Sequence, residues 1–403
     1  MDQRVKPNMR FSNLVHRVAG EGADAWEIYY RANELKQLGK SIINLCIGDP
    51  DFNSPQVAKD ALIAAVNAND THYPDIPGRP ALRAAIAETF QAQTGVSTTS
   101  ANVIFMAGAQ NSLFAVCQCL FQVGDDVIVP EPAYVTYEAT IQATGASIVK
   151  VPQPPRLGFH IDLEALERAI TPKTRGIMFA TPNNPTGAVI TAAEAAAIAA
   201  LAIKHDLWVI SDEVYGALTF EVPHVSIASV PGMAERTATV SSLAKSHAMP
   251  GFRAGWVIGP KSLIDHMHTL SLCMLYGLPG FIQEAALAAI KKGHADVARM
   301  KAIYKQRRDN LLEALGRVQT LRVAKPEGGM FVLVNVEATG LSAKDFAFRL
   351  LEEEGVALLP ADAFGPSAKG YLRICFGLGD EALAEAAKRI TAFCHRLATQ
   401  AHG

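Results

Sequence analysis

The sequence predicts an α/β protein whose large domain has a mostly parallel sheet covered by helices on both faces. From about residue 100, short apolar segments alternate with longer amphipathic ones, as strands alternate with crossover helices. The strand-like segments, such as VIFMAG (103–108) and RGIMFATP (175–182), are nearly continuous apolar runs, as expected for strands buried on both faces. Polar clusters follow these runs, at the strand ends where such sheets bind ligands.

The large domain is expected to cover residues 54–295. Its first part reads as strand 103–108, helix 109–121, strand 126–132, helix 135–145, strand 146–151 and strand 175–182. Its second part reads as a helix from residue 191 and strands 207–213, 237–242 and 254–260.

A smaller α/β domain is expected to combine residues 1–53 with residues 296–403. The first segment contains a helix that begins at Asp24 and a strand IINLCI (42–47). The second opens with a long charged helix and continues with strands FVLVNV (331–336), GVALLP (355–360) and YLRICF (371–376) and helices 342–354 and 380–396. No low-complexity linker separates the domains, so we expect an extensive interface between them.

Composition excludes several classes of protein. The chain has 403 residues, 49% hydrophobic and 19% charged, with a formal net charge of -2, which does not favour nucleic-acid binding. The apolar run AAEAAAIAALAI ends at Lys204 after about 12 residues, whereas a membrane span needs about 20. The start carries no apolar signal region. We therefore expect a cytoplasmic protein without membrane or nucleic-acid partners.

The six cysteines lie at positions 46, 117, 119, 273, 375 and 394. Most of them lie inside apolar stretches, and no pair has the C-x-x-C spacing of a zinc or redox site. We interpret them as buried thiols, with no disulfide and no metal site.

The stretch SSLAKSHAMPGFRAGW (241–256) places Lys245 between Ser242 and Arg253, directly after a strand-like segment. A lysine amine attacks a carbonyl only after losing its proton, and removal from water or a neighbouring cation lowers its pKa. Taken alone, the stretch also fits a surface hairpin with two solvated cations. Its position after a strand favours a Schiff-base lysine beside anion-binding groups.

Asp212 follows the apolar run LWVIS, which places a carboxylate at the edge of the buried sheet. A buried carboxylate without a partner is costly, so we expect a cation against it, either a structural arginine or a protonated heterocycle. Tyr215, three residues further on, can place a phenol near the same ligand. The segment SDEVY alone fits a strand-end cap equally well.

Two turns after strands indicate further ligand contacts. AGAQNS (107–112) opens a helix directly after a strand, so free backbone N–H groups there favour a phosphate. In TPNNPTG (181–187), Asn184 can donate from a fixed turn to a ligand oxygen, although Asn-Pro and Thr-Gly also simply end a strand. Neither turn is a Walker loop or a dinucleotide-binding motif.

Taken together, in this order and spacing, five segments resemble the fold-type I pyridoxal-phosphate aminotransferases of the aspartate aminotransferase group. They are HYPDIPG (72–78), TPNNPTG, SDEVY, SSLAKSHAMPGFRAGW and YLRICF. The resemblance extends from about residue 12 to residue 398. It implies the cofactor pyridoxal 5′-phosphate (PLP), an amino acid and a 2-oxo acid as substrates, and a homodimer with shared active sites.

The resemblance also implies catalytic roles. Lys245 matches the lysine that binds the cofactor as a Schiff base and then moves the substrate proton. Asp212 matches the partner of the pyridine nitrogen, whose charge strengthens PLP as an electron sink. Tyr215 and Asn184 match donors to the oxygen on the cofactor ring, and Asn184 is also placed beside the substrate. Tyr134 matches the aromatic residue stacked on the ring.

The phosphate and the substrate carboxylate have their own matched residues. Those matching the phosphate site are Gly108, Ala109, Gln110, Ser242 and Arg253, with Tyr73 matching a tyrosine that reaches the phosphate from the other subunit. Arg373 matches the arginine that binds the substrate α-carboxylate, and Gly48 a backbone donor to the same group. Taken alone, Arg373 also fits a strand-end salt bridge. A bidentate arginine would orient the substrate for proton transfer.

The substrate is less strongly indicated. LSLCMLYGLPG (270–280) carries no cation, although dicarboxylate-specific members often have an arginine there and some use a lysine elsewhere. The chain is similar in this region, and in AWEIYYRA (25–32), to arginine-pyruvate transaminases. Glu27 or Asp24 could bind a guanidinium group, but acidic residues in a first helical turn also complement the helix dipole. We expect a basic or neutral L-amino acid, L-arginine favoured, with pyruvate as acceptor.

Three alternatives remain open at the level of sequence. An aspartate-type aminotransferase and a PLP-dependent β-eliminating lyase share this fold and most of these residues. A PLP-binding regulatory module is a third, but it would need an appended helix-turn-helix with a basic face.

Overall fold

A computed structural model describes residues 10–18 and 26–401, and its centre is a seven-stranded sheet in the order β2-β8-β7-β6-β5-β3-β4. The strands are β2 Val103–Ala107, β3 Asp126–Glu131, β4 Ser147–Pro152, β5 Thr174–Ala180, β6 Trp208–Asp212, β7 Thr237–Ser242 and β8 Ala254–Ile258. Every neighbouring pair is parallel except the two that β8 makes with β2 and β7. The prediction of a mostly parallel sheet is confirmed.

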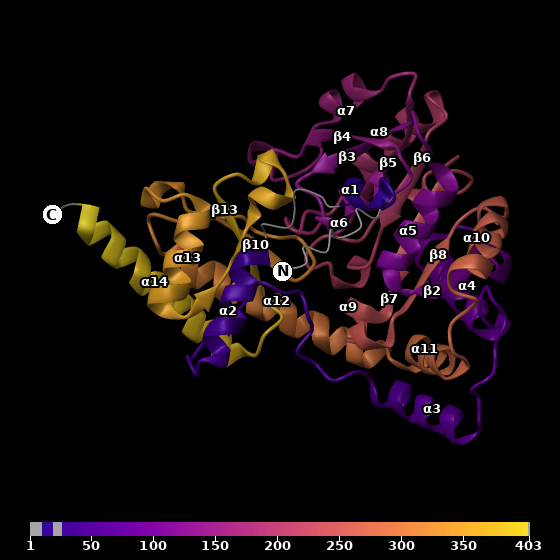
Figure 1. Cartoon of the computed structure of the whole chain (residues 1–403), viewed down its shortest axis with the longest axis horizontal. Coiled ribbons are helices and arrows are strands. Elements are labelled where there is room, and N and C mark those ends of the chain that lie inside the picture. The colour runs from indigo at the N-terminus through magenta and orange to yellow at the C-terminus, as the bar shows by residue number, and fades with distance from the viewer. Residues whose placement is uncertain (1–9, 19–25, 402–403) are drawn as a thin grey trace, which may run out of the picture.

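Helices cover both faces of this sheet (Figure 1). On one face lie α5 Gly108–Leu120, α6 Thr136–Gln142 and α10 Lys261–Met274, and on the other α4 Pro80–Thr94, α7 Leu163–Ala169, α8 Ala192–Lys204 and α11 Gly280–Lys292. Along β5, Met178 and Ala180 join the cluster that contains α5, whereas Ile177 and Phe179 pack with α8. This alternation follows from the two-residue period of a strand and explains why both faces are apolar.

The C-terminal part contains a four-stranded antiparallel sheet in the order β12-β13-β10-β9. Its strands are β9 Arg322–Val323, β10 Phe331–Asn335, β12 Leu359–Pro360 and β13 Tyr371–Cys375, and a separate parallel pair joins β1 Ile43–Asn44 to β11 Val356–Ala357. The prediction of one strand over GVALLP is wrong, because β11 pairs with β1 whereas β12 pairs with β13. The predicted strand IINLCI is shorter than expected, since β11 offers only two residues as partners.

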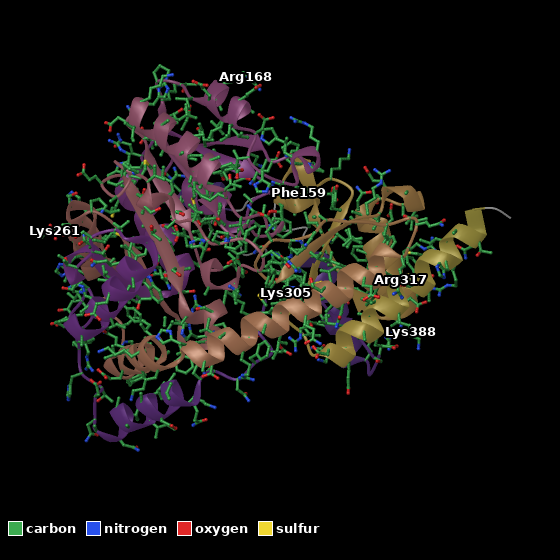
Figure 2. All side chains as sticks on the ribbon, turned by 180° about the vertical axis from the view of Figure 1, so that it is seen from behind. Phe159, Arg168, Lys261, Lys305, Arg317 and Lys388 are labelled. Carbon is green, nitrogen blue, oxygen red and sulfur yellow. The ribbon has the colours of Figure 1, made fainter. Side chains whose placement is uncertain are left out.

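The N-terminal helix α2 Glu27–Gln37 packs with the C-terminal helices α13 Ala343–Glu354 and α14 Asp380–Ala401 (Figure 1). The predicted start of this first helix at Asp24 lies outside the described residues. The long helix α12 His294–Gly316 connects the two parts of the molecule. Figure 2 shows Lys305 along α12 and Arg317 just beyond its end, beside Lys388 of α14.

The remaining α-helices are α1 Leu14–Arg17, α3 Gln56–Asn67 and α9 Leu243–Ser246. All six cysteines are free, and the prediction of buried thiols is wrong for Cys273, which is exposed on α10, and for Cys119, which is only half-buried on α5. Within residues 10–18 and 26–401, no helix is long and apolar enough to cross a bilayer. No cluster of three metal-ligating side chains occurs in the same part of the chain.

Candidate functional site

A cavity of about 290 Å³ lies at the carboxyl ends of β2, β3, β5, β6 and β7. Because β8 runs antiparallel to its neighbours, its first residues lie at this same edge, and Arg253 directly precedes them. The sequence-predicted residues that line the cavity are Gly48, Ala109, Gln110, Tyr134, Asn184, Asp212, Tyr215, Ser242, Lys245, Arg253 and Arg373. The ends of the seven-stranded sheet supply most of these residues, whereas Arg373 comes from β13 of the antiparallel sheet and Gly48 from the segment after β1.

Two predicted residues do not line this cavity. Gly108 lies behind Arg253, and a Cβ atom at Gly108 would stand 2.5 Å from Arg253 Nη2. Tyr73 is 85% exposed and contacts Tyr276 edge-to-face, with ring centroids 5.0 Å apart. Tyr73 therefore does not contribute to the cavity of its own chain.

Lys245 lies in the four-residue helix α9, which begins at the end of β7. The side chain of Ser242 caps this helix by accepting a hydrogen bond from the backbone N–H of Ala244 at 3.3 Å. Lys245 Nζ donates to the carbonyl oxygen of Gly48. Burial lowers the pKa of Lys245, which favours the neutral amine that a nucleophile or proton acceptor must be.

Asp212 is 5% exposed at the end of β6. Its carboxylate accepts hydrogen bonds from Tyr137 Oη at 2.6 Å and from the Val214 backbone N–H at 3.3 Å. Burial raises the pKa of Asp212 to about 6, and the carboxylate makes no ion pair with the residues that the structure describes. A cationic ligand group would therefore be stabilised here.

Sequence analysis missed Tyr137. It lies on α6, three residues after Tyr134, and the two rings meet edge-to-face with centroids 5.9 Å apart. Tyr134 precedes α6, so the helical period does not relate the two residues, and only their closeness in the sequence could have drawn attention to Tyr137. Trp26, Phe331 and Phe364 also line the cavity and were missed, because apolar residues in strands and loops carry no distinctive pattern.

The helix α5 begins at the wall of the cavity. Its N-cap residue Ala107 offers no side-chain hydrogen bond, so the first backbone N–H groups are open to an anion. A Cβ atom at Gly255 would stand 2.7 Å from Gly108 Cα and 2.8 Å from the Ala109 nitrogen, so β8 can approach this turn only with glycine there. The helix terminus and the adjacent Arg253 can together hold a phosphate.

Gln110 was expected to contact the phosphate, but its side chain points to helix α6 instead. The Gln110 amide donates to Thr140 Oγ1 at 3.0 Å and accepts from Thr136 Oγ1 at 2.7 Å, both on α6. Because these bonds occupy the side chain, only the backbone N–H of Gln110 is left to donate to an anion.

Arg373 lies on β13 and is 3% exposed. Nη1 donates to Asn184 Oδ1 at 2.9 Å, Nη2 donates to the carbonyl of Cys46, and Nε has no partner among the described residues. The guanidinium carbon lies 4.2 Å from the Phe331 ring centroid and 4.8 Å from that of Phe364. Burial lowers the pKa of Arg373, so a carboxylate ligand would recover part of the lost solvation.

These residues fit PLP. A buried carboxylate without a cation suits the pyridine nitrogen, a desolvated lysine suits the aldehyde, and a free helix N-terminus beside an arginine suits the phosphate. A second, buried arginine remains for a substrate carboxylate. The fold and site are those of a PLP-dependent enzyme that acts on a substrate with a carboxylate.

Comparison with known proteins agrees with this assignment. Residues 40–390 match the family model of aminotransferases of class I and II, and the chain belongs to this family. Members of the family use PLP, and the chain is a PLP-dependent aminotransferase.

Its relatives act on different amino acids. The chain is 48% identical over 393 residues to the arginine–pyruvate transaminase AruH of Pseudomonas aeruginosa, covering 98% of this chain and 100% of that protein. It is 34% identical over 370 residues to an aspartate aminotransferase of Geobacillus stearothermophilus, covering 90% and 94% of the two chains. The structure of Thermus thermophilus aspartate aminotransferase with maleate matches with a TM-score of 0.90 at 34% identity, covering 95% and 100%.

Proposed function

We propose that this aminotransferase transfers the amino group of a basic or neutral L-amino acid, L-arginine favoured, to a 2-oxo acid, pyruvate favoured. The observation that carries the proposal is that, among the described residues that line the cavity, Arg373 remains for the substrate α-carboxylate and the other two cations, Lys245 and Arg253, are assigned to the cofactor. Adding amino acid alone to the enzyme should convert PLP to pyridoxamine phosphate. A β-eliminating lyase would instead restore PLP and release pyruvate and ammonia.

Each residue of the site has a proposed part in this reaction. PLP, when bound, draws electrons from the substrate Cα. Asp212 keeps a positive charge on the pyridine nitrogen, Tyr137 holds the Asp212 carboxylate, and Arg373 orients the substrate through its α-carboxylate. Lys245, whose pKa is lowered by burial, would take the Cα proton and return it to the neighbouring carbon of the cofactor.

The other contacts fix the cofactor. Tyr134 would stack on the ring, and Tyr215 and Asn184 would donate to the oxygen on it. Burial raises the pKa of Tyr215, so its phenol keeps the proton that it donates. The proposed phosphate contacts are Gly108, Ala109, Gln110, Ser242 and Arg253, and Gly48 adds a backbone contact to the substrate.

The cavity walls favour arginine over aspartate. The charged side chains among the described lining residues are Asp212, Lys245, Arg253 and Arg373, and each already has a proposed ligand. A distal carboxylate would therefore find no partner. The indole of Trp26 lines the cavity, and tryptophan is the best side-chain acceptor for a stacked guanidinium.

The expectation that Glu27 binds the guanidinium is not supported by its position. Glu27 pairs with Lys344 at 2.8 Å and does not line the cavity. Asp24, the other carboxylate considered, lies outside the described residues. Aromatic stacking is therefore the interaction that we assign to the substrate side chain.

L-Arginine is expected to react with the PLP form at least about tenfold faster than L-aspartate, compared as rate over concentration, because aspartate would bury an unpaired carboxylate. The measurement is the single-turnover loss of PLP absorbance after mixing. L-Alanine is the control, since its side chain places no charge in the cavity. A clear preference for aspartate would instead favour the second candidate, an aspartate aminotransferase.

We also propose that the active form is at least a homodimer in which Tyr73 reaches the neighbouring phosphate site. Tyr73→Phe is expected to weaken PLP binding about tenfold, because a hydrogen bond to a charged group is lost. PLP titration measures this effect, and Tyr276→Phe, at the ring that contacts Tyr73, is the matched control. A fully active monomer in light scattering at assay concentration would refute the proposal.

Two further assignments belong to this proposal. The large domain comprises residues 54–295 and the small domain residues 1–53 with 296–403, a division supported by the buried cluster that joins Ile28 and Leu35 of α2 to Leu350 of α13 and Phe393 of α14. A cytoplasmic location is supported by the free cysteines.

A further inference from the structure

A buried glutamate connects the two main sheets next to the cavity. Glu131, the last residue of β3, is 5% exposed. Its carboxylate accepts hydrogen bonds from the Ser367 backbone N–H at 2.9 Å and from Ser367 Oγ at 2.6 Å. We call this pair of bonds the Glu131–Ser367 clasp. It joins the seven-stranded sheet to the segment 361–370, which connects β12 to β13.

Two more contacts show that this segment is fitted closely against the end of β3. The backbone N–H of Ala133 donates to the Phe364 carbonyl at 2.9 Å. Gly365 has a φ of +141°, and a Cβ atom there would stand 2.3 Å from Glu131 Oε2. Only glycine combines this backbone conformation with such a close approach. The clasp is therefore a specific junction between two parts of the chain.

The clasped segment determines where Phe364 lies. Phe364 is 4% exposed, lines the cavity and faces the Arg373 guanidinium, whose carbon is 4.8 Å from the Phe364 ring centroid. Phe331 lies 4.2 Å from the same carbon. A guanidinium packed against two rings has little freedom to tilt, and tilting would break a two-bond contact with a carboxylate.

We propose that Glu131 is a positioning residue for substrate binding. By holding Ser367, it fixes Phe364 against Arg373 and keeps the guanidinium in the orientation that accepts the α-carboxylate. The inference rests on the proposed role of Arg373 and extends it, because it places a determinant of substrate affinity on the opposite sheet, outside the cavity wall. Both substrates carry an α-carboxylate, so the clasp affects the amino acid and the 2-oxo acid alike.

Ser367→Ala and Glu131→Gln in the PLP-loaded enzyme test this inference. Each is expected to raise the apparent dissociation constants of L-arginine and of pyruvate by a similar factor of about ten, while the rate at saturation changes less than about threefold. Single-turnover titrations with L-arginine (PLP form) and with pyruvate (pyridoxamine form) measure both quantities. Ser367→Thr, which keeps the hydroxyl and the backbone N–H, is expected to restore affinity.

The control is Ser342→Ala, which also removes a serine hydroxyl bonded to a carboxylate at 2.6 Å, that of Asp345 at the start of α13. If it weakened both substrates as Ser367→Ala does, lost stability would explain the effect and the inference would fail. Unchanged dissociation constants in Ser367→Ala and Glu131→Gln would also overturn it. Arg373→Lys distinguishes failure of this inference from failure of the proposed function. A normal affinity for both substrates in that variant would refute the proposed role of Arg373 itself.

Discussion

Lys245→Ala is expected to abolish covalent attachment of PLP and to lower the rate of transamination by about four orders of magnitude or more. The variant loses the side chain proposed as both the nucleophile that binds the cofactor and the base that moves the substrate proton, and a single general base contributes about 10² to 10⁴ in rate. Lys245 is the only lysine among the described residues that line the cavity. Borohydride reduction followed by peptide mapping measures the attachment, and stopped-flow absorbance measures the rate.

Lys261→Ala is the matched control. Lys261 pairs with Asp265 on the exposed surface of α10, at the edge of the molecule opposite Lys388 in Figure 2, and its loss should leave both quantities unchanged. PLP found reducibly attached at another lysine of purified Lys245→Ala protein would contradict the assignment of Lys245.

Asp212→Asn is expected to retain PLP but to slow transamination by about 10² to 10⁴. The substitution keeps the shape of the side chain and removes the negative charge proposed to face the pyridine nitrogen, and fixed charges in a dry site contribute effects of this size. Single-turnover rates with a saturating amino acid measure the loss. Asp162→Asn, at the N-cap of α7 where asparagine caps equally well, is the control, and near-normal turnover of Asp212→Asn would show that Asp212 is only structural.

The titration of Asp212 adds a pH dependence to this prediction. Burial raises its pKa from 3.8 to about 6, so in the cofactor-free protein the charged carboxylate is destabilising, and this effect grows from pH 4 and is complete above pH 6. A cofactor that supplies a cation should remove this penalty. The rise in melting temperature on adding PLP should thus be larger at pH 8 than at pH 5, and this difference should be smaller in Asp212→Asn.

Most of the residues that line the cavity could be predicted from their residue types and from their positions next to expected strands. Lys245, Asp212 and Asn184 each follow an apolar run, and the α/β alternation predicts that such positions meet at one edge of a parallel sheet. Arg253 instead precedes its strand. It reaches the same edge because β8 is antiparallel to its neighbours, a pairing that the sequence of β8 does not encode.

Short strands were predicted less well. The run GVALLP reads as one strand, but β11 and β12 take different partners. A two-residue strand is defined by the backbone groups that face it rather than by its own side chains. Such assignments depend on contacts between residues hundreds of positions apart, such as Ile43 with Val356.

The sequence by itself predicted the class of fold, because the two-residue period of a strand and the 3.6-residue period of a helix are local properties. Its resemblance to a known family indicated the cofactor and the candidate site residues. Only the tertiary structure decided which other residues contact those groups or hold their neighbours in place. Tyr137 donates to Asp212, Phe364 faces Arg373, and Glu131 holds the segment that carries Phe364. Their own segments give no sign of these roles, because each role consists of a contact that forms only when distant strands and loops pack together.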